Sequence, residues 1–142
     1  MDLSQLSTKQ LSEEGVVHTV IDPRTGDPLL DDNGSSTTIT LSGVDGAKYR
    51  DYQRKVQNRR LKSIGKGKTR LDLDAAELEQ EGLELLATCT LSWTGIAWQG
   101  EELPCNPKNA EMLYSELGWL RDQVDGFIGD RQNFFPQPAS SS

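Results

Sequence analysis

The stretch of sequence that decides the fold covers residues 87–135 and reads A-T-C-T-L-S-W-T-G-I-A-W-Q-G-E-E-L-P-C-N-P-K-N-A-E-M-L-Y-S-E-L-G-W-L-R-D-Q-V-D-G-F-I-G-D-R-Q-N-F-F. It holds all three tryptophans and all three phenylalanines of the 142-residue chain. Its spacing predicts a helix that ends near Trp93, a polar turn around Gly100 and a second helix. Asn106 predicts the start of that last helix, because its side chain can accept a hydrogen bond from a free backbone N–H group and Pro107 needs no donor at the first helical position.

The part of the chain before this stretch predicts a β-hairpin over residues 16–43. Residues 16–21 are mostly β-branched and residues 37–41 alternate between polar and apolar, as strands do. Between them, residues 24–28 and 31–34 have the composition of turns. A hairpin alone is marginally stable, so we expect a helix or another chain to cover it.

Together these patterns predict an α+β fold, with an N-terminal β-hairpin followed by three α-helices and a mainly helical C-terminal half. Asp45 is positioned to cap a basic helix, in which Tyr49, Tyr52 and Val56 share one face. We expect one domain over residues 16–135. The predicted segments are a flexible N-terminal segment or frayed helix at 1–15, the hairpin at 16–43, the basic helix at 45–63, a linker at 64–71, a helical pair at 72–135 and a disordered tail at 136–142.

Charge is segregated along the chain. Residues 45–70 contain ten Lys or Arg against two Asp, a net charge of +8. Since the whole chain has a net charge of −7, the remainder of the chain carries −15. Three interpretations of the basic segment stay open: a solvated helix face, attraction to an acidic protein surface through Arg54, Lys55, Arg59 and Arg60, or contact with nucleic acid. Nucleic acid is disfavoured, because the chain is acidic overall and the linker has no aromatic residue on which bases could stack.

The residues that catalysis or metal binding would need are scarce. His18 is the only histidine, and Cys89 and Cys105 lack the spacing of metal ligands, so we expect no catalytic residues, no metal and no cofactor. The Gly67-Lys68-Thr69 run lacks the earlier glycine of a phosphate-binding loop. No apolar run approaches 18 residues, so we expect no membrane span and a cytoplasmic protein with reduced thiols.

The aromatic residues divide into two groups. Trp93 and Trp119 fall at helical spacing and are expected to anchor the packing of the last two helices. Trp98 lies in a predicted turn, and Phe134 and Phe135 lie just before the tail. Aromatic residues outside an apolar stripe are candidates for partner contact, where Trp is over-represented.

The order and spacing of these elements resemble the tail assembly chaperones of long-tailed bacteriophages. The resemblance covers residues 16–135 and includes a Y-R…R-K…N-R-R-L helix at residues 49–61. The hairpin residues that carry it are Asp22, Pro23, Thr25, Gly26 and Pro28. The C-terminal residues that carry it are Trp93, Gly100, Leu103, Pro104, Asn106, Asn109, Ala110, Asp130, Arg131, Asn133 and Phe134.

The resemblance implies a non-enzymatic role. Chaperones of this kind bind the aggregation-prone tape measure protein, keep it soluble and help recruit tail tube protein subunits. They act in the host bacterial cytoplasm and are not retained in the mature virion, and many also exist in a longer frameshifted form. Self-association is a further possibility. The alternatives are a structural virion subunit, such as a tail or connector component, and a small nucleic-acid-binding regulator that uses the basic segment.

Overall fold

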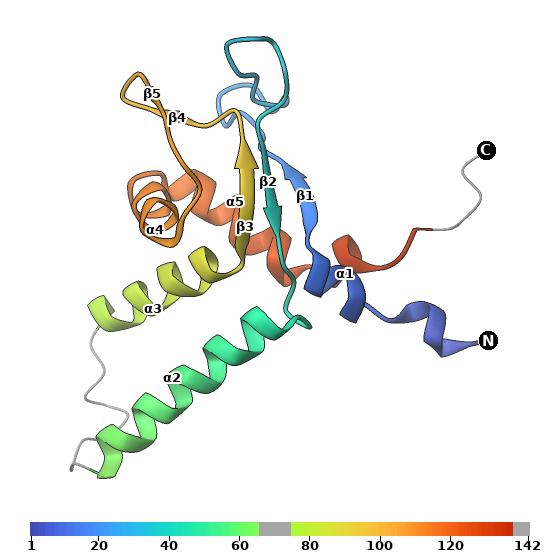
Figure 1. Cartoon of the computed structure of the whole chain (residues 1–142), viewed down its shortest axis with the longest axis vertical. Helices are drawn as coiled ribbons and strands as arrows, with labels where there is room; N and C mark the ends of the chain where they lie inside the picture. The colour runs from blue at the N-terminus through green and yellow to red at the C-terminus, as the bar shows by residue number, and fades with distance from the viewer. Residues whose placement is uncertain (66–74, 138–142) are drawn as a thin grey trace.

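The computed structural model describes residues 1–65 and 75–137, and they form an α+β protein. The prediction of an α+β fold is therefore confirmed, but the predicted hairpin with three helices differs from the observed element order (Figure 1). The elements are η1 (Leu3–Leu6), α1 (Lys9–Glu14), β1 (Val16–Thr19), β2 (Thr38–Leu41), α2 (Ala47–Gly65), α3 (Ala75–Thr88), β3 (Thr90–Thr94), β4 (Ala97–Trp98), β5 (Glu101–Glu102), α4 (Pro107–Glu116), α5 (Gly118–Gly129) and η3 (Arg131–Phe134).

The predicted hairpin is present as β1 and β2, which pair antiparallel with Val16 opposite Leu41. Between the strands the chain turns tightly at residues 22–27, where Gly26 adopts a φ of +81° that favours glycine. The loop then folds back onto the strands, because the Leu29 N–H donates to Val20 O and the Thr37 N–H donates to Leu29 O, both at 2.8 Å. The turn residues of the sequence thus close the hairpin as expected.

The hairpin gains a third strand that the sequence analysis assigned to a helix. α3 ends at Thr88, and β3 follows at once and pairs antiparallel with β2, so the strand order is β1-β2-β3. The prediction of a helix that continues to Trp93 is wrong. Thr90, Ser92 and Thr94 alternate with Leu91 and Trp93, which is a strand pattern, and pairing with β2 outweighs the helical spacing of the preceding residues.

The main core lies between one face of the sheet and helices α3, α4 and α5. Ile39 and Leu41 point into it from β2, and both are completely buried. The helices contribute Leu83, Leu86, Ala87, Ala110, Leu113, Tyr114, Leu120, Val124 and Ile128. Alternation along the strands places Val17, Thr40 and Ser92 on the opposite face of the sheet.

The predicted last helix is divided in two. Leu117, with φ −115° and ψ 84°, interrupts the helical backbone between α4 and α5. The apolar residues between positions 110 and 128 pack in the core, but they belong to two helices and not to one continuous helix. The predicted cap of α4 is confirmed, because the Asn106 side chain accepts a hydrogen bond from the Asn109 N–H at 2.8 Å.

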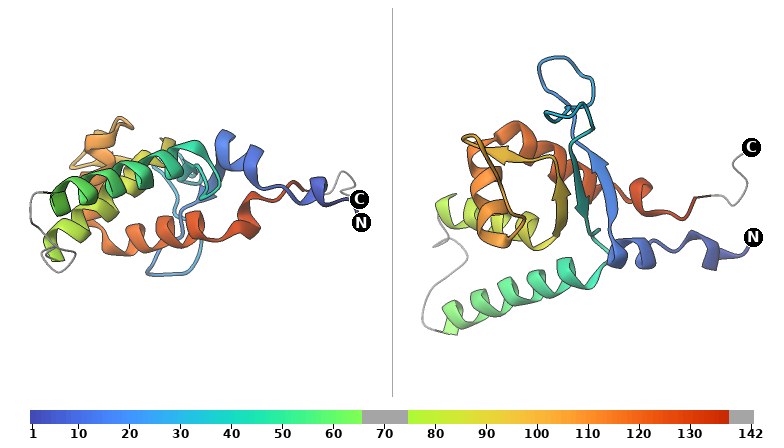
Figure 2. Two further views of the ribbon diagram at one scale, coloured as in Figure 1. Left: turned by 90° about the horizontal axis from the view of Figure 1, so that it is seen from below. Right: turned by 45° about the horizontal axis from the view of Figure 1, so that its top comes forward.

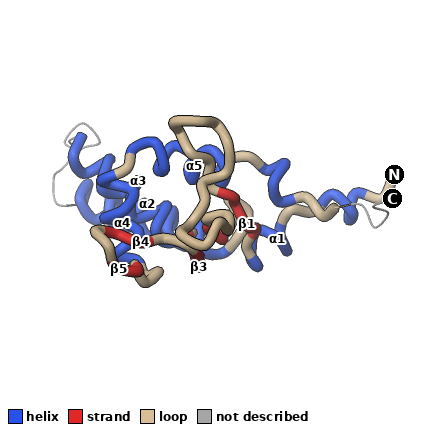
Figure 3. Tube along the Cα trace, turned by 90° about the horizontal axis from the view of Figure 1, so that it is seen from above, coloured by secondary structure: helices blue, strands red, loops and turns tan. Residues whose placement is uncertain are grey.

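The N- and C-terminal segments run side by side (Figure 3) and meet beside the turn between β2 and α2 (Figure 1). Ser12 of α1 is 1% exposed and packs so closely that a Cβ on Gly43 would lie 2.6 Å from its hydroxyl. Residues 1–15, expected to be flexible, thus contain two helical segments and a buried residue. The Asp45 carboxylate accepts hydrogen bonds from Thr8 and Arg131, while Glu13 accepts from the Ala47 N–H at the start of α2. The predicted capping role of Asp45 is therefore taken by Glu13.

Helix α2 forms one end of the molecule and packs mainly on α3 (Figures 1 and 2). Tyr52 and Val56 are buried in this contact, as the sequence spacing predicted. α2 extends to Gly65, so it includes the first residues of the predicted linker; the rest of that linker and most of the predicted tail lie outside the described residues.

Candidate interaction surfaces

The first candidate surface is the arm formed by α2 and α3. Three polar contacts join the two helices: the Tyr52 hydroxyl donates to Glu84 at 2.9 Å, Arg60 pairs with Glu81 at 2.7 Å, and Arg59 pairs with Glu84 at 3.6 Å. Burial and the bond to Glu84 raise the pKa of Tyr52, so this hydroxyl remains a donor at neutral pH. The helices are thus joined by charge as well as by apolar packing.

These ion pairs change the interpretation of the basic helix. Of the four predicted partner-binding cations, Arg59 and Arg60 are engaged with α3 and stabilise the arm itself. Arg54 pairs with Asp51 within α2 and remains 69% exposed, and Lys55 is exposed. Arg54 and Lys55 therefore form no ion pair with the described residues of α3, whereas Arg59 is exposed but paired with Glu84, and Arg60 is half-buried.

Two open grooves flank the line of contact between α2 and α3. The larger, of about 410 Å³, is lined by charged residues that include Arg59, Glu77 and Glu84. The other, of about 350 Å³, has an apolar floor of Tyr52, Val56, Leu78 and Leu85, with Gln53, Gln57, Arg60, Glu81 and Gly82 completing its lining. Leu78 is 51% exposed, so part of this floor is open to solvent. The second groove has the mixed character that an amphipathic helix recognises.

The second candidate surface lies under the β4–β5 hairpin. Gln99 and Gly100 join these strands with φ values of 52° and 86°, which is a tight two-residue turn. Trp98 is half-buried and lines an apolar pocket of about 160 Å³ together with Ile96, Leu117 and Trp119. The predicted turn is confirmed. Trp98 also packs against the core, and Trp119, expected to be an anchor of the helices, both packs there and lines the pocket.

The Phe pair separates into a core residue and a half-buried one. Phe134 is completely buried, and its ring packs edge-on against Phe127 with centroids 5.7 Å apart. The prediction that Phe134 contacts a partner is therefore wrong, because η3 turns its side chain inward beside Gly43. Phe135 follows η3 and is half-buried.

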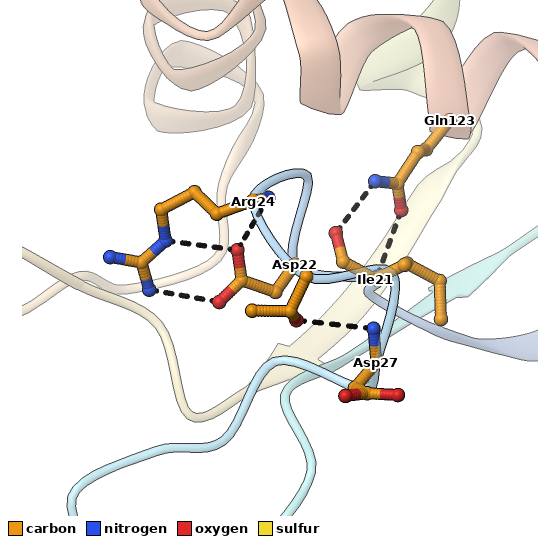
Figure 4. Close-up of polar contacts among 6 residues, drawn as sticks. Ile21, Asp22, Arg24, Asp27 and Gln123 are labelled. Atoms are coloured by element: carbon orange, nitrogen blue, oxygen red, sulfur yellow. Dashed lines mark hydrogen bonds and ion pairs between the residues drawn. The ribbon is translucent and has the colours of Figure 1, made fainter.

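Several of the motif residues hold backbone groups in place. The Trp93 indole N–H donates to Leu103 O at 2.8 Å, and the Asn109 and Asn133 amides donate to Pro104 O and Phe127 O at 2.8 and 3.0 Å. In the hairpin, Asp22 accepts from the backbone and side chain of Arg24, which lowers the pKa of Asp22 to about 2 (Figure 4). These side chains are therefore structural.

Sequence analysis missed Gln123, which joins α5 to the hairpin. Its amide oxygen accepts from the Ile21 N–H at 3.0 Å and its amide nitrogen donates to Ile21 O at 2.8 Å (Figure 4). The same oxygen lies 3.2 Å from His18 Nε2, and burial lowers the pKa of His18. A lone glutamine inside an apolar stripe was the only signal for this contact.

Residues 1–65 and 75–137 contain no group of three or more His, Cys, Asp or Glu that could hold a metal ion. In the same ranges, no helix is long and apolar enough to cross a membrane. Burial raises the pKa of the Cys89 thiol to about 11, so it stays protonated and is a poor nucleophile. Comparison with protein-family models, curated proteins and solved structures gives no match.

Proposed function

We propose that this chain is a non-enzymatic phage tail assembly chaperone that binds and solubilises a tape measure protein in the host cytoplasm. The proposal rests on the sequence resemblance and on one structural observation, the groove of mixed character between α2 and α3. Its apolar residues come from both helices, Tyr52 and Val56 from α2 and Leu78 and Leu85 from α3. A partner helix that lies in it would complete a three-helix packing unit.

The exposed apolar residues of the arm support this assignment. Leu61, Ile64 and Leu78 are 65%, 50% and 51% exposed, and all three lie on α2 or α3. A helical, aggregation-prone partner presents apolar residues at spacings of three and four. Covering such a stripe with an apolar groove removes it from water, which is the physical requirement for keeping the partner soluble.

The same geometry argues against the nucleic-acid alternative. The Arg59 and Arg60 guanidinium groups are paired with glutamates of α3, so phosphate would have to compete with existing ion pairs. The larger groove, which Arg59 lines, also contains several carboxylates that repel phosphate. A neutral helix that packs by apolar contact meets no such conflict.

Co-expression with the tape measure protein tests the proposal. The wild-type chain should move that protein from the pellet to the supernatant, and the two should co-purify. Leu78→Ser should reduce both effects, because it removes an exposed part of the groove floor without opening the core. Leu30→Ser is the matched control, since Leu30 is 58% exposed but lies in the hairpin loop.

Two results would count against the chaperone. One is a tape measure protein that stays insoluble and does not co-purify with a folded wild-type chain. The other is the presence of this chain in purified virions at a stoichiometric level, measured by mass spectrometry, which would favour the structural virion subunit. Recruitment of tail tube protein is tested by adding it to the purified complex.

A further inference from the structure

The apolar pocket under the β4–β5 hairpin is shaped for one side chain. It has a volume of about 160 Å³, and its walls include Leu29, Ile96, Trp98, Leu117 and Trp119. A dry apolar cavity of about 150 Å³ is known to hold a benzene molecule. A leucine, isoleucine or phenylalanine side chain therefore fits this pocket.

Four acidic residues lie next to residues that line the pocket. Glu101 lies opposite Trp98 and Glu102 opposite Ala97 in the small sheet. Asp31 lies close to Gly95, where an added Cβ would be 3.2 Å from its carboxylate. Glu116 directly precedes Leu117 of the pocket wall. The geometry favours an apolar side chain that is flanked by positive charge.

The outer face of α2 has this combination. Leu61 and Ile64 are 65% and 50% exposed. Leu61 lies seven residues, or two helical turns, after Arg54, so the two residues lie on the same side of α2. It lies five residues after Val56, so it is on a different side from Val56, which packs on α3. α2 carries seven Lys or Arg and one acidic residue. Leu61 is therefore an exposed apolar residue on a helix that is basic overall, and Arg54 lies on its line.

We propose that α2 of one copy docks in the β4–β5 pocket of a second copy, with Leu61 in the pocket and the cations of α2 against its acidic rim. Figure 1 shows α2 and the β4–β5 hairpin well apart, with α3 and α4 between them, so one copy cannot fill its own pocket. The interface joins two different surfaces. Each added copy therefore leaves one pocket and one α2 face free, and the assembly grows as a chain or closes into a ring.

Sedimentation of the purified full-length chain tests this proposal without any tape measure protein. The wild-type mass should rise with protein concentration and fall as salt is added, because screening weakens the charge attraction. Leu61→Glu places a like charge against the rim and should lower the association constant by at least about tenfold. The double variant Glu101→Lys, Glu102→Lys should do the same from the pocket side.

Mixing the two variants gives the decisive result. The Leu61→Glu chain retains its pocket and the double variant retains its α2 face, so together they should form a 1:1 dimer that grows no further. Leu3→Ser, at a 72% exposed position in the N-terminal segment, is the control and should behave as wild type. Circular dichroism tests whether each variant is folded, and we expect all of them to fold because the substituted residues are exposed.

Three outcomes would overturn the proposal. The first is a wild-type chain that stays monomeric at about 1 mM, a concentration at which even a contact of about 4 kcal/mol would be half-occupied. The second is an assembly that persists in both variants, and the third is a pair of variants that do not associate alone and do not associate when mixed. Leu78→Ser should self-associate like wild type, because the groove between α2 and α3 is not used. Loss of self-association and loss of chaperone activity are therefore separable.

Discussion

Replacing Phe134 with alanine should strongly destabilise the protein. The ring is completely buried, packs edge-on against Phe127 and lies 3.0 Å from where a Cβ on Gly43 would be. The close approach of the backbone at Gly43 leaves little room for collapse around the lost ring. Truncation of a buried Phe costs about 3–5 kcal/mol, and the aromatic pair adds up to about 1.5 kcal/mol beyond its buried area. We expect a loss of about 4 kcal/mol.

Urea unfolding measures this loss. With an m-value of about 2 kcal/mol/M, a loss of 4 kcal/mol lowers the unfolding midpoint by about 2 M. Since domains are stable by only about 5–15 kcal/mol, this loss removes roughly a quarter to four-fifths of the free energy of unfolding. Phe135→Ala is the matched control and should shift the midpoint much less, because Phe135 is only half-buried. An unchanged midpoint for Phe134→Ala, with weakened partner binding, would refute the core assignment and restore a surface role.

Three further perturbations have defined outcomes. Gln123→Ala should lower the free energy of unfolding by about 1–3 kcal/mol, measured by urea, because it leaves the Ile21 backbone groups without their partner. The pKa of His18 in the folded protein is below its usual value of 6.5, so the unfolded chain binds the proton more readily. The contribution of His18 to the free energy of unfolding should therefore be complete above pH 6.5 and decrease as the pH falls below it. His18→Asn should remove that part of the pH dependence. Arg60→Gln should cost no more than about 1 kcal/mol by thermal unfolding, because the Arg60–Glu81 pair is partly solvent-exposed and screened.

The sequence predicted the elements whose signals are local. Turn residues at 22–27 closed the hairpin, Asn106 capped α4, and the spacing of Tyr52 and Val56 identified the buried face of α2. Each of these depends on residues within a few positions of each other. Their side chains either satisfy nearby backbone groups or repeat with the helix period, so the pattern and the structure coincide.

The elements that sequence reasoning missed depend on distant partners. β3 is a strand because β2 lies beside it, and β2 is about fifty residues earlier in the chain. Asp45 is a residue type that often caps helices, and it lies just before α2. Its carboxylate nevertheless accepts hydrogen bonds from Arg131 and Thr8, and these contacts lower the pKa of Asp45. Phe134 looks like an exposed aromatic beside a tail until η3 turns it towards Gly43. Local pattern carries no information about any of these contacts.

The motif residues that suggest the phage family also limit what that resemblance can explain. Trp93, Asn106, Asn109 and Asn133 each form a hydrogen bond with a backbone group and so hold turns and helix ends in place. A chain that retained them would keep this scaffold whatever partner it bound. We therefore expect partner choice to depend on residues outside the motif, and the arm and the β4–β5 pocket are the two candidate surfaces that present such residues. Substitutions at these two surfaces, made in a scaffold that remains folded, are therefore the ones that separate function from fold.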